Sequence, residues 1–418
     1  MYITYSDDKR LTENALKTKT NKLFTYRKKI EEYRSTNNSS VSEYSLYYAQ
    51  DYDLQETLSS IKKNYKGVKH LVLLGIGGSS LGLEAIHSVL NDKRVTLSIL
   101  DTVSANSLND VLTEVKKLKK VSQIAICIIS KSGNTTETLA NASILLAELE
   151  LHFSTDIYKQ TFFIGDNNTD LVKYAKKVSA TYISIPNVIG GRYSVATAVG
   201  LVPMAILGYD TDEFISGYMD ASQEQYETIT ADSAARISLY YQNKYQHYNF
   251  FAFETRLEKL GRWYRQLFAE SLGKEFDLDN KLVSNTIIPT ISTPIELHSI
   301  GQLYLSGRAN VYTDFVTFDD ETIDFKIPNK TKLATSIKGL SMQEIATALY
   351  GGVIGAYKER QLPFRATIFE ESLTYSLGLF MAMRLREVMY TANLLNLNAF
   401  DQPNVELYKI KTKEILNI

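Results

Sequence analysis

A series of short, almost entirely apolar runs, separated by longer segments of helical periodicity, constrains the fold of this chain most strongly. The runs in its first half are His70–Leu74, Val95–Leu100, Ile124–Ile129, Thr161–Ile164 and Thr181–Ile185. Helical spacing of apolar residues lies between them, for example at Leu81–Leu90 and Thr135–Leu149. Strands that lack polar alternation are typical of a parallel sheet covered by helices on both faces. The sequence therefore predicts an α/β fold.

The same alternation returns in the second half of the chain. Strands are predicted at Tyr248–Phe253, Thr286–Ile291, Val311–Phe318 and Phe364–Phe369, and helices at Leu257–Leu272, Ile295–Leu305, Met342–Arg360 and Glu371–Asn393. We therefore expect two domains, each a mostly parallel sheet flanked by helices, at residues 56–215 and 216–395. Residues 1–55 and 396–418 are expected to form N- and C-terminal helical segments.

The composition argues against several classes of protein. Lys and Arg total 46 against 47 Asp and Glu, a net charge of -1, whereas nucleic-acid-binding proteins usually carry a basic excess. The single cysteine, Cys127, lies in an apolar run and is expected to be a buried structural thiol. No apolar stretch reaches the roughly 18 residues of a membrane span, and the N-terminus lacks the apolar core of a signal peptide. We expect a cytoplasmic protein that binds neither nucleic acid nor a membrane.

The first predicted strand runs into a glycine–serine turn, Gly75–Gly82, that precedes a helix. Glycines at such a turn let the backbone approach a ligand closely, and the new helix offers unpaired N–H groups to an anion. The turn resembles the start of a dinucleotide fingerprint, but Ser80 stands where the third glycine would be, and a Walker lysine is absent, so a nucleoside triphosphate is not favoured. A tight turn without a ligand explains this loop almost as well.

A second strand-to-helix loop, Ser130–Thr138, is rich in hydroxyl groups. Asn134 and Glu137 have the spacing of a capping pair and are expected to satisfy the helix N-terminus. The other hydroxyls form a neutral cradle suited to a dianionic phosphate: Ser130, Ser132, Thr135 and Thr138. Lys131 either attracts the anion or remains solvated, and we count it with the binding residues. Two such loops in one sheet favour a bound sugar phosphate.

Three further residues are candidates for proton chemistry. Arg192, in a turn between an apolar strand and an apolar helix, can fix a phosphate or stabilise an oxyanion, although a surface salt bridge explains it equally well. Gln266 and Glu270 lie four residues apart and share a helix face. Glu270 falls in the last turn, where the helix dipole disfavours a negative charge. This should raise the proton affinity of its carboxylate slightly, which is useful in a general base. An exposed helix face is the competing explanation.

His298 is better placed than the other four histidines. Thr293–Glu296 has the pattern of an N-cap, a proline and a reciprocal glutamate, so His298 is expected in the second turn of a well-anchored helix. No histidines or acids fall at metal-ligand spacing, and one cysteine cannot form a thiolate site. We therefore expect no catalytic metal and no cofactor.

Together these segments resemble the glucose-6-phosphate isomerase (phosphoglucose isomerase) family, bacterial type. Asn187–Gly200 agrees with the first signature of the family and Phe400–Lys409 resembles the second. Four other segments occur in the order of the family, so that the resemblance spans roughly residues 65 to 410: Gly75–Gly82, Ser130–Thr138, Ala269–Lys274 and Glu296–Gln302. The resemblance implies two sugar isomerase (SIS) domains, a homodimer and interconversion of glucose 6-phosphate and fructose 6-phosphate through an enediolate, in glycolysis and gluconeogenesis.

The resemblance also implies roles for individual residues. Glu270 matches the base that moves a proton between C1 and C2, and Arg192 matches the group that stabilises the enediolate. His298, which in the family enters from the partner subunit, and Lys409 match the pair that opens the sugar ring. The remaining matches contact phosphate or sugar: Gly78, Ser79, Ser130, Ser132, Thr135, Thr138 and Gln266.

One residue departs from the pattern of the family. Asn404 stands where the second signature has glycine or alanine, and the position of Lys409 depends on this turn. Asparagine tolerates a left-handed backbone better than most residues, which favours an intact turn. Two other functions remain open: a non-catalytic sugar-phosphate sensor, and an isomerase of another phosphosugar such as mannose 6-phosphate. The joint presence of Glu270, His298 and Lys409 favours an enzyme over a sensor.

Overall fold

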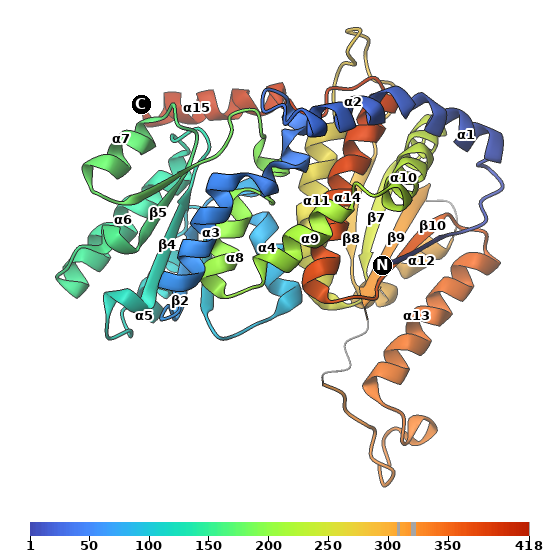
Figure 1. The fold of residues 1–418 in the computed structure, drawn as a ribbon. Helices are drawn as coiled ribbons and strands as arrows, with labels where there is room; N and C mark the ends of the chain where they lie inside the picture. Colours follow the sequence, from blue (N-terminus) through green and yellow to red (C-terminus); the bar gives the residue numbers. More distant parts are fainter. Residues whose placement is uncertain (307–309, 319–322, 418) are drawn as a thin grey trace.

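Two five-stranded sheets lie side by side in this chain, and helices cover both of them (Figure 1). The structure is a computed structural model that describes residues 1–306, 310–318 and 323–417. The prediction of an α/β fold with parallel sheets flanked by helices is confirmed. Within the described ranges, no helix combines the length and the apolar character that crossing a membrane requires.

The first sheet is parallel throughout and has the strand order β3-β2-β4-β5-β6. Its strands are β2 (His70–Leu74), β3 (Thr96–Leu100), β4 (Ile124–Ile129), β5 (Thr161–Gly165) and β6 (Thr181–Ser184). Because side chains alternate along a strand, the central strands supply two cores at once. Val72 and Leu74 of β2 belong to the apolar cluster on one face of the sheet, whereas Leu71 and Leu73 belong to the cluster on the other face. This two-sided burial explains why the strands read as continuous apolar runs.

The second sheet has the order β1-β10-β9-β7-β8 and is parallel except at one edge. Its strands are β7 (His247–Ala252), β8 (Ile288–Ser292), β9 (Val311–Phe318), β10 (Phe364–Phe369) and β1 (Tyr2–Tyr5). Strand β1 pairs antiparallel with β10, so the N-terminal segment predicted to be helical also contributes an edge strand. Four residues are too few for a periodicity to predict a strand, and the pairing partner lies over 350 residues away in the chain.

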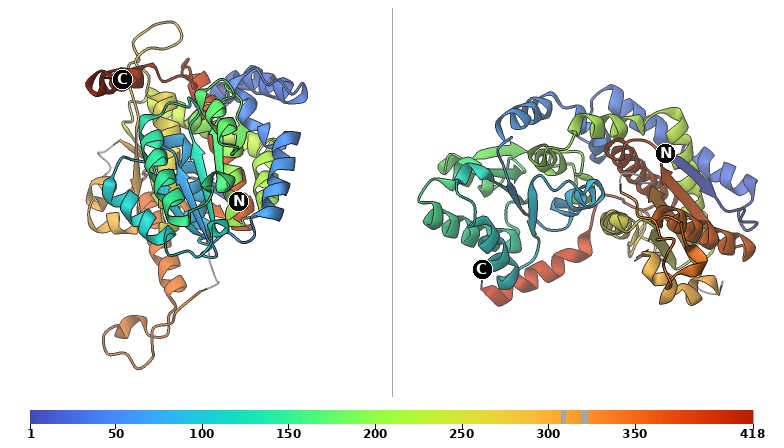
Figure 2. Two further views of the ribbon diagram at one scale, coloured as in Figure 1. Left: turned by 90° about the vertical axis from the view of Figure 1, so that its left-hand side faces the viewer. Right: turned by 90° about the horizontal axis from the view of Figure 1, so that it is seen from below.

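The helices around the first sheet are α3 (Tyr52–Asn64), α4 (Leu81–Leu90), α5 (Ala105–Val115), α6 (Thr136–Phe153), α7 (Asp170–Lys177) and α8 (Ala198–Leu207). The others are α1 (Glu13–Lys22), α2 (Phe24–Ser35), α9 (Thr211–Asp220), α10 (Glu224–Gln242), α11 (Glu258–Leu272), α12 (Gly301–Leu305), α13 (Met342–Glu359), α14 (Leu373–Leu394) and α15 (Glu406–Leu416). One continuous apolar core extends from the first sheet through α4 and α11 to the second. Figures 1 and 2 show α13 and the loop before it projecting from the body, and α15 lying along the opposite end of the molecule.

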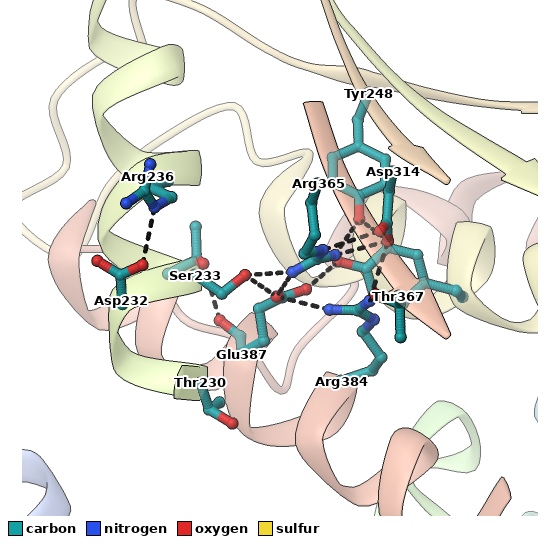
Figure 3. Close-up of polar contacts among 12 residues, drawn as sticks. Thr230, Asp232, Ser233, Arg236, Tyr248, Asp314, Arg365, Thr367, Arg384 and Glu387 are labelled. Carbon is teal, nitrogen blue, oxygen red and sulfur yellow. Dashed lines mark hydrogen bonds and ion pairs between the residues drawn. The ribbon is translucent and has the colours of Figure 1, made fainter. Parts of the chain in front are cut away.

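Two arginines and two acids form a buried ionic network beneath the second sheet (Figure 3). Arg365 of β10 donates to Asp314 of β9 at 2.6 Å and contacts Glu387 of α14. Arg384 of α14 donates to the same two acids at 3.0 and 2.9 Å. The two positive and two negative charges balance, which offsets part of the cost of removing them from water. The hydroxyl of Tyr264 donates to Glu387 at 2.6 Å, so the network also holds α11 in place.

The Glu387 carboxyl is kept ionised by this network. Burial alone would raise its pKa, but the guanidinium groups of Arg365 and Arg384, with the hydrogen bonds from Arg365 and Ser233, lower the pKa to about 2. A carboxyl whose pKa is lower in the folded state than in the unfolded state stabilises the fold above its unfolded pKa. That contribution is lost as the pH falls through the folded value.

Replacing Glu387 by glutamine should therefore destabilise the protein strongly at neutral pH. Glu387→Gln leaves two buried arginines facing one carboxylate, and breaking such a pair costs about 3–5 kcal/mol. Urea unfolding at pH 7 measures the loss, which should shrink as the pH is lowered toward 2, where wild-type Glu387 also becomes protonated. Glu359→Gln, at an exposed position on α13, is the matched control and should change stability by no more than about 0.5 kcal/mol. Equal stability of the two variants would contradict a structural role for the network.

Candidate active site

Most of the candidate residues, though not His298 and Lys409, gather at the carboxyl edge of the first sheet. β2 and β4 are hydrogen-bonded neighbours, so the loops that follow them, Gly75–Gly82 and Ser130–Thr138, leave the same edge side by side. The turn after β6 contains the 3₁₀ helix η6 (Gly191–Tyr193), which packs against the Gly75–Gly82 loop. Helix α11 reaches this point from the second half of the chain and touches both. The prediction that two strand-to-helix loops meet at one edge is confirmed.

Gly78 allows the first loop and the arginine turn to touch. A Cβ atom at this position would lie 2.2 Å from the carbonyl carbon of Gly191 and 2.7 Å from the backbone nitrogen of Arg192. Gly77 next to it has a φ of +61°, and a Cβ there would lie 2.8 Å from the amide nitrogen of Gln266. Only glycine fits such an approach of backbone to backbone. Ser79 completes the turn and is half-buried.

Arg192 is buried, with its side chain 2% exposed, so the interpretation as a surface salt bridge is wrong. The guanidinium has five N–H donors, and five acceptors lie 2.6 to 3.2 Å from its nitrogens: Ser271 Oγ, Glu270 Oε2, Gln402 Oε1, and the carbonyl oxygens of Ala399 and Asp401. Tyr193 supports this arrangement, because its hydroxyl bonds both to Ser271 Oγ at 2.8 Å and to the Ala399 carbonyl at 3.1 Å. The charge is therefore held at a fixed place.

Glu270 lies where the buried contacts of Arg192 meet solvent. Its side chain is 34% exposed, and its carboxylate accepts from Arg192 Nη1 at 3.2 Å and from the Gln266 amide at 3.1 Å. The predicted shared helix face of Gln266 and Glu270 is confirmed by that bond. One oxygen of Glu270 thus faces a buried cation and the other faces an amide, while the carboxylate keeps contact with solvent. A carboxylate in this setting can take a proton from a bound molecule.

The hydroxyl loop has donors that its own residues leave without partners. Ser130 and Thr135 bond to each other at 2.9 Å. Thr138 is buried, and within the described structure its hydroxyl has no hydrogen-bond partner. The expected capping by Asn134 and Glu137 is wrong: Thr135 is the N-cap of α6, and no side-chain cap bond is present there. The N-terminus of this 18-residue helix therefore lacks a side-chain cap, and its third residue, Thr138, carries a buried hydroxyl without a partner.

The other two residues of this loop differ in their exposure. Ser132 is exposed, and Lys131 is half-buried. Burial lowers the pKa of the Lys131 ammonium, and nearby Asp166 acts in the opposite direction. Lys131 is therefore less fully solvated than the alternative interpretation required.

His298 and Lys409 are not brought to Glu270 by any contact in the described structure. The predicted helix at 295–305 is instead a 3₁₀ turn, η8 (Pro294–His298), followed by the short α12. Glu296 accepts from the backbone N–H and the hydroxyl of Thr293 as predicted, but His298 is exposed and makes no bond to a described residue. Lys409 is exposed on α15 and pairs with Glu406 at 2.6 Å. The expected second helical turn around His298 is therefore wrong.

Gln402 and Ser271 are site residues that the sequence analysis missed. Both lie inside motifs that resemble the family, and Gln402 follows Asp401 in the second signature, so inspecting each polar residue of those motifs could have found them. Asn404 lies in the 3₁₀ helix η10 (Pro403–Val405) and is not among the residues with positive φ. The concern about a left-handed backbone at this position therefore does not apply. In the described ranges, no three His, Cys, Asp or Glu side chains gather as a metal site would require.

Comparison with known proteins identifies relatives across most of the chain. The phosphoglucose isomerase family model matches residues 20–337. A glucose-6-phosphate isomerase of Clostridium tetani is 30% identical over 392 residues, which cover 86% of this chain and 83% of that protein. A glucose-6-phosphate isomerase of Thermus thermophilus is 28% identical over 370 residues, covering 86% of this chain and 88% of the relative.

Solved structures share the fold over nearly the whole chain. A hypothetical protein from Thermus thermophilus superposes with a TM-score of 0.85 at 26% identity, covering 99% of this chain and 100% of the other. A glucose-6-phosphate isomerase from Chlamydia trachomatis gives a TM-score of 0.79 at 17% identity, covering 99% and 88%. The family model matches about three quarters of this chain, and one relative is 30% identical over most of it. The chain therefore belongs to the phosphoglucose isomerase family.

Proposed function

We propose that this chain interconverts glucose 6-phosphate and fructose 6-phosphate, and that the paired Glu270 carboxylate and Arg192 guanidinium perform the chemistry. The single observation that carries the proposal is their arrangement: a partly exposed carboxylate 3.2 Å from a guanidinium that is otherwise wholly enclosed by protein. Family membership and the names of the curated relatives support the same reaction.

The reaction moves a carbonyl group between C1 and C2 of an open-chain hexose phosphate. Glu270 removes the proton from C2 of the aldose, the electron pair forms the C1–C2 double bond, and the carbonyl oxygen takes the negative charge of an enediolate. A proton then passes from O2 to O1, which moves the negative charge to O2, and returning the carbon-bound proton to C1 forms the C2 carbonyl of the ketose. One carboxylate that reaches both carbons from one side performs both transfers. The solvent contact of Glu270 leaves room for the two carbons beside it.

Arg192 keeps the charge of the site balanced throughout the reaction. Before the proton moves, its guanidinium faces the Glu270 carboxylate; afterwards Glu270 is neutral and the negative charge is on the substrate. A fixed cation beside both positions stabilises the enediolate without reorganisation of the protein. We propose that Nη1 is the nitrogen that contacts the enediolate. Its two acceptors, Glu270 and Gln402, are partly or fully exposed, whereas the acceptor of Nε and one acceptor of Nη2 are buried.

The phosphate is proposed to bind in the hydroxyl loop at the other end of the site. Thr138 and the uncapped N-terminus of α6 provide donors that lack partners in the free protein, and Ser130, Ser132 and Thr135 add hydroxyls. Binding energy from this remote group orients the reacting carbons next to Glu270. Gly78, Ser79 and Gln266 are proposed to contact the sugar between the two ends, since Gly78 lies against the arginine turn and Gln266 lies beside Gly77.

The ring-opening residues are proposed to come together only in a homodimer. His298 is exposed and unpaired within the described chain, which supports its donation to the site of a partner subunit. Lys409 would act on the same ring oxygen from the exposed helix α15. We propose a cytoplasmic location for this homodimer. Whether mannose 6-phosphate is also isomerised depends on how the pocket accommodates the hydroxyl at C2.

Purified protein should form glucose 6-phosphate from fructose 6-phosphate at the same rate with and without a chelator, and mannose 6-phosphate is offered as a second substrate in the same assay.

Glu270→Gln preserves the size and the hydrogen bond to Gln266 but removes the base, so kcat should fall by roughly 10²–10⁴-fold. Glu258→Gln, in the first turn of the same helix, is the control and should retain full turnover. A coupled spectrophotometric assay measures both. Undiminished turnover in Glu270→Gln would eliminate the proposed base, and phosphosugar binding without any turnover in wild type would favour a sensor.

Replacing Thr138 by valine separates binding from folding. Valine has nearly the same shape, and removing a buried hydroxyl without a partner should leave the free protein as stable or slightly more stable. KM should rise roughly 10- to 150-fold, because a hydrogen bond to a charged group contributes about 1.5–3 kcal/mol. Steady-state kinetics and thermal unfolding test the two halves. Thr113→Val on α5, whose hydroxyl bonds to its own helix, should leave KM unchanged. A wild-type KM in Thr138→Val would place the phosphate elsewhere.

A further inference from the structure

Lys274 connects the end of α11 to the segment that encloses Arg192. Its side chain is only 8% exposed, although it lies two residues beyond the helix. The ammonium donates to the backbone carbonyl of Glu270 at 2.8 Å and to the Asp401 carboxylate at 2.9 Å, and it contacts the Asp401 carbonyl as well. One cation therefore bonds to the residue that carries the base and to a loop 127 residues away in sequence.

The Asp401 carbonyl is shared by two cations. Arg192 Nη2 donates to it at 3.0 Å, and Lys274 reaches the same oxygen from the other side. Arg192 in turn bonds to the Glu270 carboxylate, while Lys274 bonds to the Glu270 backbone. The contacts form a closed ring in which each residue restrains the next. Removing Lys274 opens the ring on the side of the helix while leaving both Glu270 and Arg192 in the chain.

A simple helix cap would not need this arrangement. Lysines near a helix C-terminus often bond to the last carbonyl groups, and the bond to the Glu270 carbonyl alone fits that description. The bonds to Asp401 do not, because they fix a separate segment that also supplies Gln402 to Arg192. Burial lowers the pKa of the Lys274 ammonium, whereas its bond to Asp401 acts in the opposite direction.

We infer that Lys274 is a positioning residue for the isomerisation, which ties Asp401 to the backbone of Glu270 and so sets the distance between the carboxylate base and the Arg192 guanidinium. This inference rests on the proposed function. It concerns the transition state, in which proton and charge move between these two groups, and it does not concern the phosphate. A small displacement of a catalytic group lowers the rate strongly while leaving the binding of remote groups unchanged.

The test compares Lys274→Met, Asp401→Asn and the double variant. Methionine keeps an unbranched apolar stem but removes the charge. We expect Lys274→Met to lower kcat roughly 10- to 100-fold with KM changed less than about twofold. Asp401→Asn should have a smaller effect, since it keeps the carbonyl. The double variant should be no slower than Lys274→Met, because two residues of one contact are not additive.

Two inhibitors distinguish positioning from a general structural role. Arabinonate 5-phosphate carries a carboxylate where the enediolate charge develops, whereas sorbitol 6-phosphate carries the phosphate and hydroxyls without that charge. Lys274→Met should weaken the binding of arabinonate 5-phosphate in proportion to the fall in kcat and leave the binding of sorbitol 6-phosphate unchanged. Lys116→Met, which breaks a lysine–glutamate pair between α5 and α6, is the control and should alter neither inhibitor nor kcat.

The outcomes separate this inference from the proposed function. Absence of isomerase activity in wild type would remove the function itself. An active wild type with a Lys274→Met variant of unchanged kcat would overturn the positioning role. The positioning role would also be overturned if Lys274→Met lost affinity for both inhibitors equally, or if its thermal midpoint fell far enough to account for the lost activity. Lys274 would then only support the fold. Partial recovery of kcat in Lys274→Arg, which restores the cation, would support it.

Discussion

The enclosure of one guanidinium determines how the rest of this site is assembled. Arg192 cannot be buried unless its five donors are matched, because an unsatisfied buried cation costs several kcal/mol. The matching acceptors come from the end of α11 and from residues 399–402, more than 200 residues beyond Arg192. Satisfying one side chain therefore brings both halves of the chain and its C-terminal region to the carboxyl edge of the first sheet.

Each half of the chain contributes a different part of the proposed chemistry. The parallel sheet of the first half ends in loops with backbone and hydroxyl donors, which suit a phosphate. The second half supplies α11, a rigid helix anchored at Tyr264 to the ionic network beneath the second sheet and carrying Glu270 in its last turn. A base on a firmly packed helix and a phosphate site on a separate sheet hold the two ends of an extended substrate apart. The family assignment accords with this division.

Local features were predictable from the sequence, and long-range ones were not. Strands β2 and β4 begin and end where their apolar runs do, because burial on both faces leaves no polar interruption. The predicted bounds of β9 and β10 also agree with the structure, although these strands carry Asp314 and Arg365. The Gln266–Glu270 bond follows from helical spacing. The contact of Gln402 with Arg192 joins residues 210 apart, and β1 pairs with a strand at the far end of the chain, so no local pattern encodes either. The helix predicted around His298 failed because a capping signal fixes where a turn begins but not how long it continues.

The proposed reaction requires a carbon-bound proton to pass through the Glu270 carboxylate. The most direct measurement is NMR of the product formed from fructose 6-phosphate in deuterated water. A carboxylate in contact with solvent exchanges the proton it carries, so deuterium should appear at C2 of glucose 6-phosphate with wild-type protein, and Glu270→Gln should give neither product nor label at a comparable rate. Product formed by wild type without any deuterium at C2 would mean that the transferred hydrogen does not exchange on a solvent-exposed carboxylate, as in direct hydride transfer between the carbons, and would contradict the role proposed for Glu270.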